Sequence, residues 1–173
     1  KTFGSLVRID CWYYGGWLHN GIHIVDTLVF LFGQTLECKN VVRATPIGQQ
    51  DWAVDAVFGI PNTKLEIHVH FFEEALYQLF EFDFKFTDAR LRIENFESDV
   101  LLETVAINAL GERVLQKEDL SAFFATENSL PIKSALAYIS EQLSGDGDCK
   151  AHGLESAALA LRTLWDVKKR INL

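Results

Sequence analysis

The sequence has no methionine and only three prolines among its 173 residues. Because it also begins at Lys1, we expect it to be a piece of a longer protein. It lacks the run of about 18 apolar residues that a membrane-spanning helix requires, since Asp26 and Thr27 interrupt its longest apolar stretch. This absence predicts a protein with no membrane span.

Cysteines and basic residues are also scarce. The three cysteines, Cys11, Cys38 and Cys149, are odd in number and form no C-x-x-C pair, which favours reduced thiols in a cytoplasmic protein over a disulfide framework. Lysine and arginine number 16 against 24 acidic residues, giving a net charge of −8. Apart from a basic run at 168–170 they are scattered, so we expect neither nucleic acid nor an anionic membrane as a partner.

About half of the sequence, 49%, is apolar, which at this length predicts a single domain over residues 1–173. Apolar and polar residues alternate over much of the chain, most clearly at 77–86, where four phenylalanines lie opposite charged residues. Such alternation predicts strands with one packed face and one polar face. The expected strands cover residues 3–14, 36–45, 52–60, 64–72, 77–86, 89–96 and 101–107.

Helical spacing predicts helices at 15–33, 130–143 and 154–171. Short turns between most strands predict an antiparallel meander, and the helices are expected to cover its packed face. The fold class is therefore α+β, with an open-faced, largely antiparallel β-sheet and helices packed on one face. The opposite face is expected to carry mixed charges that pair across strands; its members are Glu66, His68, His70, Glu81, Asp83, Lys85, Arg90, Arg92 and Glu94.

Candidate chemistry lies in the helix at 15–33. His19 and His23 are four residues apart and Asp26 follows three residues later, so helical spacing places them on one face. Histidine titrates near neutral pH and suits general acid–base catalysis. The alternative is that His23 is buried and hydrogen-bonded to Asp26 or to a backbone carbonyl, holding the start of the helix in place.

Aromatic residues crowd the start of this helix. Tyr14 and Trp17 are candidates for stacking on a sugar ring, whereas Trp12 is expected to pack inside the protein. The alternative is that these residues pack in the core, with their hydroxyl or indole N–H groups hydrogen-bonded to a neighbouring group.

Four histidines could share a zinc ion if the helix pair His19 and His23 met the strand pair His68 and His70. No pattern brings the two pairs together, and no H-E-x-x-H motif supplies a glutamate base. We therefore expect no metal.

The stretch GGWLHNGIHIVDTLVFLFG also resembles the helix that begins the C-terminal domain of the glucose–fructose oxidoreductase/inositol dehydrogenase/MocA (Gfo/Idh/MocA) family. Gly21, His23 and Asp26 fall on the last three fixed residues of the family's D-x-G-x-H-x-x-D pattern, whereas His19 replaces its first aspartate. The resemblance implies a substrate-binding and oligomerising domain of an NAD(P)-dependent oxidoreductase that acts on a sugar, cyclitol or sugar nucleotide. It further implies a homodimer or higher homo-oligomer that pairs through the open sheet face.

The resemblance also implies roles for individual residues. His23 and His19 are the expected catalytic residues, and Asn20, Trp17 and Tyr14 the expected substrate-binding residues. NAD or NADP would be bound mainly by a Rossmann domain absent from this sequence, which has neither G-x-G-x-x-G nor the family's Glu-Lys-Pro. The chain alone is therefore expected to be inactive. A noncatalytic binding or assembly module is the alternative that the replacement at His19 supports.

Overall fold

The computed structural model describes residues 3–73, 76–94, 99–119 and 154–171. Its elements are β1 (Leu6–Tyr13), η1 (Trp17–Gly21), α1 (Ile22–Phe32), β2 (Glu37–Ile47), β3 (Asp51–Gly59), β4 (Glu66–Phe71), β5 (Glu81–Phe86), β6 (Ala89–Glu94), β7 (Asp99–Ile107), β8 (Arg113–Lys117) and α4 (Leu154–Ile171). The expected helix at 130–143 lies outside the described residues. The last helix has the predicted bounds, and the lysines and arginine of its final turn suit the negative end of the helix dipole.

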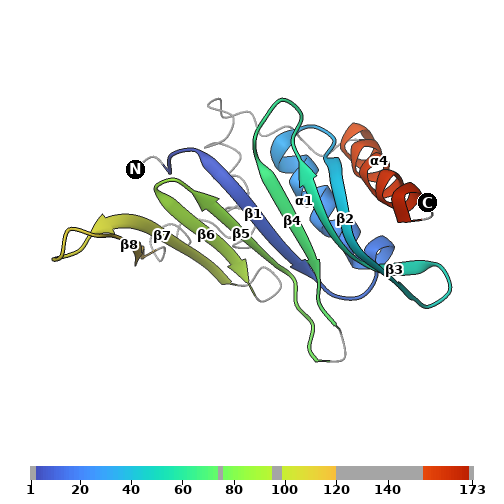
Figure 1. Cartoon of the computed structure of the whole chain (residues 1–173), viewed down its shortest axis with the longest axis horizontal. Helices are drawn as coiled ribbons and strands as arrows, with labels where there is room; N and C mark the ends of the chain where they lie inside the picture. The colour runs from blue at the N-terminus through green and yellow to red at the C-terminus, as the bar shows by residue number, and fades with distance from the viewer. Residues whose placement is uncertain (1–2, 74–75, 95–98, 120–153, 172–173) are drawn as a thin grey trace.

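The strands form one eight-stranded sheet in the order β2-β3-β4-β1-β5-β6-β7-β8 (Figure 1). Every neighbouring pair is antiparallel except β1 and β4, which are parallel. The simple meander expected from the sequence is wrong at one point, because β1 lies between β4 and β5. Alternation reports which face a strand buries, but it carries no information about which strands are neighbours.

Strand β8 was not predicted, because all five of its residues are exposed and they lack an apolar alternation. A local turn creates it: the side-chain oxygen of Asn108 accepts hydrogen bonds from the backbone N–H groups of Leu110 and Glu112, both at 2.9 Å. Gly111 adopts a φ of 80°, which favours glycine. The chain therefore reverses and adds one more edge strand.

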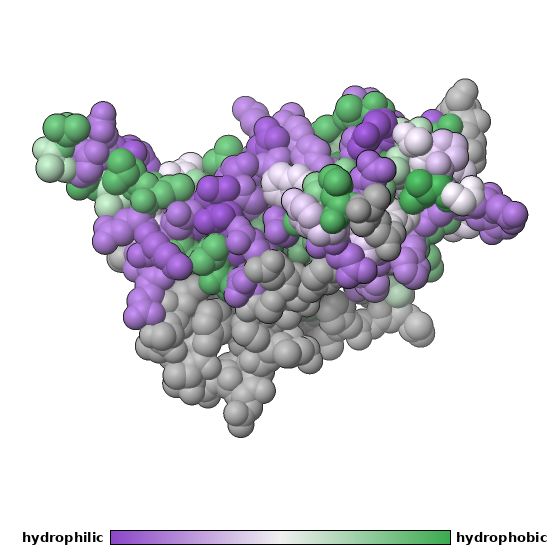
Figure 2. Space-filling model, turned by 90° about the horizontal axis from the view of Figure 1, so that it is seen from below, coloured by the Kyte–Doolittle hydropathy of each residue, from purple (hydrophilic) through white to green (hydrophobic). Residues whose placement is uncertain are grey.

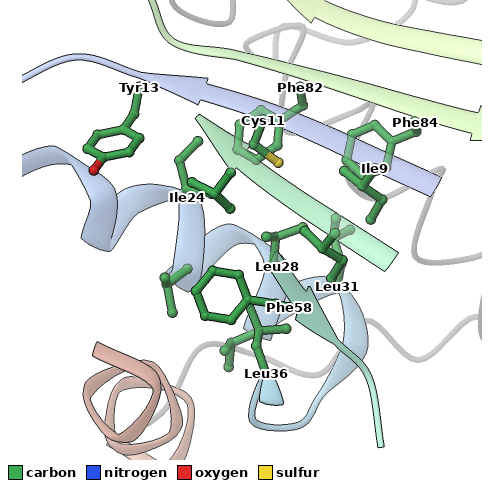
Figure 3. Packing of buried hydrophobic residues seen from close by; sticks show 14 of the residues in the cluster. Ile9, Cys11, Tyr13, Ile24, Leu28, Leu31, Leu36, Phe58, Phe82 and Phe84 are labelled. Carbon is green, nitrogen blue, oxygen red and sulfur yellow. The ribbon is translucent and has the colours of Figure 1, made fainter. Parts of the chain in front are cut away.

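The core lies between the sheet and α1 (Figure 3). Ile24, Leu28 and Leu31 project from α1 toward the apolar side of the strands, where Phe58 and Phe82 lie. Burying such side chains is the main favourable term in folding. Helix α4 packs beside α1 and adds a buried face made of Ala160, Leu164 and Val167. Both described helices thus cover one face, which confirms the predicted α+β class.

Hydrophilic residues dominate the described surface in the view from below, and apolar residues gather at the end where the β7–β8 hairpin lies (Figure 2). The exposed apolar side chains of this hairpin include Ile107, which is 66% exposed, and Leu110, which is 82% exposed. Within the part of the chain that the structure describes, no helix has the length and apolarity needed to cross a membrane.

Candidate functional site

The predicted helix at 15–33 does not begin as a regular α-helix. It opens with the π-helical turn η1 and continues as α1 to Phe32, with Gly33 in the left-handed conformation as predicted. The carbonyl oxygen of Gly16 lies within hydrogen-bond distance of three successive N–H groups, those of His19, Asn20 and Gly21, at 3.2, 2.8 and 3.1 Å. Such turns are frequent at functional sites, and this one carries His19 and Asn20.

Asp51, the first residue of β3, anchors the turn from outside. Its Oδ1 accepts hydrogen bonds from the backbone N–H groups of Leu18 at 2.9 Å and Trp52 at 2.8 Å. Gly16 allows this approach, since a Cβ atom there would lie 1.7 Å from Asp51 Oδ2. Sequence reasoning missed Asp51 because it caps the turn from 33 residues away, where no capping pattern reaches.

Trp17 supports the turn η1 from the core side. Its ring is fully buried and stacks on Phe58, with centroids 6.0 Å apart and planes 11° apart. A Cβ atom on Gly21 would lie 2.5 Å from Trp17 Cε3, so only glycine fits there without movement. The substrate contact expected of Trp17 stays a prediction, although core residues enclose the ring here.

Tyr13 ties the end of β1 to β3 across the intervening strand β4. Its hydroxyl donates a hydrogen bond to the carbonyl of Val54 at 3.0 Å and accepts one from the N–H of Val54 at 2.9 Å. Burial raises the pKa of this phenol far above its ordinary value, so the hydroxyl stays protonated and holds both bonds. The sequence did not single out Tyr13, which nevertheless fixes the point where the chain enters η1.

The remaining predicted site residues lie at the surface. His19 and His23 are exposed, whereas Asn20 and Tyr14 are half-buried. The ring of His23 meets that of Phe80 edge-on at 6.5 Å. The alternative of a buried His23 is therefore wrong, while the catalytic and substrate-binding roles of these residues stay predictions.

The open face of the sheet carries ion pairs between strands, as predicted. Arg90 donates two hydrogen bonds of 2.9 Å to Asp83, and Lys85 Nζ lies 2.6 Å from Asp10 Oδ2. Asp10 and Asp83 are 2% and 4% exposed although no described helix covers them. Neighbouring long side chains shield them, so these pairs are stronger than ordinary surface pairs.

Trp12 lies on this open face, so its expected place in the core is wrong. The register pairs it with His70 of β4 and Glu81 of β5, and its ring stacks on that of His70 at 5.5 Å and 28°. The expectation failed because aromatic and polar residues are mixed at 3–14, so no alternation there shows which side of β1 faces the core.

Because of Asp10, the folding stability should depend on pH in the acidic range. Burial raises the pKa of its carboxyl, but hydrogen bonds from Arg8 and Lys85 outweigh burial and lower the pKa from 3.8 to about 2. The folded protein then binds this proton more weakly than the unfolded chain. The resulting stabilisation, about 2 kcal/mol, is complete above about pH 4 and is lost as pH falls through about 2.

Urea unfolding of the Asp10→Asn variant at pH values on either side of this window should therefore show a smaller acid dependence than the unaltered protein. Glu37→Gln is the matched control, since Glu37 belongs to an exposed pair with Lys39 and should change little. An equal acid dependence in the Asp10→Asn variant and the unaltered protein would contradict the assignment.

His68 and His70 gather with Asp10, and one ligand atom from each lies within 4.8 Å of the others. Among the described residues this is the one group of three or more side chains able to hold a metal ion, and it includes neither His19 nor His23. The four-histidine arrangement considered from the sequence therefore does not form. Cys11 and Cys38 are free and buried, and burial raises the pKa of both thiols.

No family model matches the sequence, and no curated protein matches it either. Solved structures do match. A dehydrogenase (MviM) from Clostridium difficile aligns over 96% of this chain and 55% of its own, with 14% identity and a TM-score of 0.57.

Two further matches come from enzymes with named substrates or ligands. UDP-N-acetylglucosamine 3-dehydrogenase GnnA from Acidithiobacillus ferrooxidans aligns over 94% of this chain and 53% of its own, with 11% identity and a TM-score of 0.52. A variant of KijD10, a 3-ketoreductase from Actinomadura kijaniata in complex with TDP-benzene and NADP, aligns over 96% and 52%, with 15% identity and a TM-score of 0.55.

At these identities the likeness concerns the fold. The chain spans about half the length of each of these solved structures. Its mostly antiparallel sheet with two helices matches one part of these enzymes. The chain has the fold of the C-terminal domain of Gfo/Idh/MocA-type oxidoreductases.

Proposed function

We propose that this chain is the substrate-binding domain of an NAD(P)-dependent oxidoreductase that acts on a sugar, cyclitol or sugar nucleotide. The observation that carries the proposal is the exposed pair His19 and His23. His19 lies on the π-helical turn η1, which Asp51 anchors and Trp17 supports, and His23 lies in the first turn of α1, which follows directly. The fold is shared with a UDP-N-acetylglucosamine 3-dehydrogenase and with a 3-ketoreductase in complex with TDP-benzene and NADP, which supports the choice of substrate class.

His23 would exchange a proton with the substrate hydroxyl, since its imidazole is exposed and histidine suits this task at neutral pH. In the full-length protein a lysine from the missing domain would share that proton transfer. His19 and Asn20 would donate or accept hydrogen bonds that orient neighbouring hydroxyl groups. Tyr14, half-buried beside them, would offer an aromatic face to the ring.

The cofactor would be bound mainly by another domain. This sequence has no G-x-G-x-x-G turn to hold a pyrophosphate. The residues present therefore do not form the principal binding site for NAD or NADP. A nicotinamide supplies hydride chemistry wherever it is bound, and the contribution of this chain would be to place the substrate carbon. We therefore propose that the chain alone is inactive.

The direct test is to assay the full-length protein with NAD⁺ or NADP⁺ and a panel of sugars, cyclitols and sugar nucleotides, following absorbance of the reduced nicotinamide. Turnover with a member of the panel is expected from the full-length protein, and none from residues 1–173 alone. Turnover by this chain alone would contradict the proposed division of labour.

A noncatalytic binding or assembly module is the second candidate, and the histidine at position 19 favours it. An imidazole does not reproduce the fixed negative charge of the aspartate found in many family members. The panel separates the two candidates: saturable binding of a sugar-like compound without turnover in the full-length protein would favour the module.

We further propose that the protein forms a homodimer or higher homo-oligomer through the open sheet face. Helices α1 and α4 lie on the other side of the sheet (Figure 1). The open face combines paired charges with half-buried apolar groups such as Val57 of β3. Opposite charges on one face allow it to meet a copy of itself about a two-fold axis.

Light scattering should return at least a dimer mass at micromolar concentration. Val57→Glu should shift the mass toward the monomer, because it adds an unpaired charge to the interface. Arg162→Glu, on the exposed side of α4, is the control and should leave the mass unchanged. A monomer mass for the unaltered protein would refute this mode of assembly.

A further inference from the structure

The strand register places two imidazoles and a carboxylate side by side on the open face. Strands β1 and β4 are parallel, and the register pairs Asp10 with His68 and Trp12 with His70. His68 and His70 are two residues apart on one strand, so both point to the same side of the sheet. A chelating pair on one strand therefore faces a carboxylate on the next.

Packing orients these groups before any ion is present. The His70 ring is held between the ring of Trp12 at 5.5 Å and that of His68 at 6.3 Å. Asp10 is fixed by Arg8 and Lys85. A site whose ligands already occupy defined positions loses less conformational entropy on binding.

The spacing of the ligand atoms suits a small transition-metal ion. His70 Nε2 lies 3.7 Å from Asp10 Oδ1, which is too far for a hydrogen bond. Zinc holds nitrogen and oxygen ligands at about 2.0–2.2 Å, so tetrahedral ligand atoms are about 3.4 Å apart. A small rotation of the imidazoles would bring all three ligands to that separation.

Two neighbouring cations oppose metal binding at the site, and one neighbouring carboxylate favours it. Arg8 and Lys85 compete for Asp10, but their side chains are 43% and 41% exposed and can swing into water. Glu66, 66% exposed, lies 3.2 Å from His68 Nε2 and adds a negative charge beside the imidazoles. Two imidazoles with carboxylates favour zinc, cobalt, nickel or copper over magnesium or calcium.

We propose that Asp10, His68 and His70 form a binding site for a divalent first-row transition-metal ion, with Glu66 able to complete the coordination. This site lies on the face of the sheet opposite the helix that carries His19 and His23, so it is separate from the proposed substrate site. It replaces the expectation from sequence that the chain holds no metal.

The test uses Co²⁺ as the probe, added to the metal-stripped full-length protein by dialysis to equilibrium, so that the ion reaches the face even in an oligomer. Saturable binding is expected, with visible bands of nitrogen and oxygen coordination. His70→Gln and His68→Gln should each raise the Kd more than about tenfold, since loss of even an outer-shell partner costs roughly 10–100-fold.

Two further variants sharpen the test. Lys85→Gln removes a competing cation and should lower the Kd, whereas His23→Gln, on the other face, should leave it unchanged. Absence of saturable binding by the unaltered protein would overturn the site. A thiolate charge-transfer band, or a Kd that neither His68→Gln nor His70→Gln changes, would overturn it equally.

Discussion

Replacement of His23 by alanine in the full-length protein is expected to lower kcat by roughly 10²–10⁴-fold, the usual contribution of a general acid–base group. The folding stability should change little, because His23 is exposed and lies outside the buried core. Measurement of kcat, KM and the thermal midpoint on the same preparation separates these effects.

Arg162→Ala is the matched control for the His23→Ala experiment. It also shortens an exposed polar side chain on a helix, so it reports any general effect of such a change on turnover or stability. Unchanged turnover in the His23→Ala variant would refute the catalytic role. A loss of stability comparable to the loss of activity would instead assign His23 a structural role.

The largest stability effect is expected at Trp17. Trp17→Ala should destabilise the protein by about 3–5 kcal/mol, because it removes a fully buried ring and leaves a cavity against Phe58 and Tyr13. Urea unfolding of the two proteins gives this difference directly. A loss below about 1 kcal/mol would show that the site collapses without cost and that Trp17 does not support the turn.

Trp17→Phe is the informative companion variant. The Nε1 atom of Trp17 is buried and has no hydrogen-bond partner among the residues that the structure describes. Phenylalanine therefore removes an unsatisfied donor while keeping most of the stacking on Phe58. We expect a much smaller loss of stability than with alanine. If Trp17 also touches the substrate, Trp17→Phe should raise KM in the full-length protein; an unchanged KM would restrict the residue to packing.

The sequence predicted those parts of the fold that depend on local periodicity. The alternation at 77–86 identified the buried phenylalanines of β5, and the apolar spacing at 154–171 gave the bounds of α4. The place of β1 could not be derived this way, because hydrogen bonds between distant strands determine it. Strand β8 was not predicted because its residues are all exposed and therefore show no alternation of apolar and polar side chains.

The same distinction between local spacing and distant contacts applies to the candidate site. Local spacing identified His19 and His23, but the π-helical turn that carries His19 and leads into the helix of His23 is held by Asp51 and by the packing of Trp17 against Gly21. Asp10 gave no signal, because its importance arises only when β4 and β5 lie on either side of β1. A residue whose role depends on two distant strands has no pattern in its own neighbourhood.

The central place of β1 also constrains how the protein reaches its fold. The remaining strands form two blocks, β2–β4 and β5–β8, each built from consecutive hairpins. In the described sheet these blocks meet only through β1, where Arg8 pairs with both Glu66 and Lys85. The hairpins can form early from local contacts. Completing the sheet requires β1 to insert between β4 and β5, which lie much later in the sequence. Pairing between strands so distant in sequence is slow. Until that insertion, both inner edges remain open to pairing with other chains.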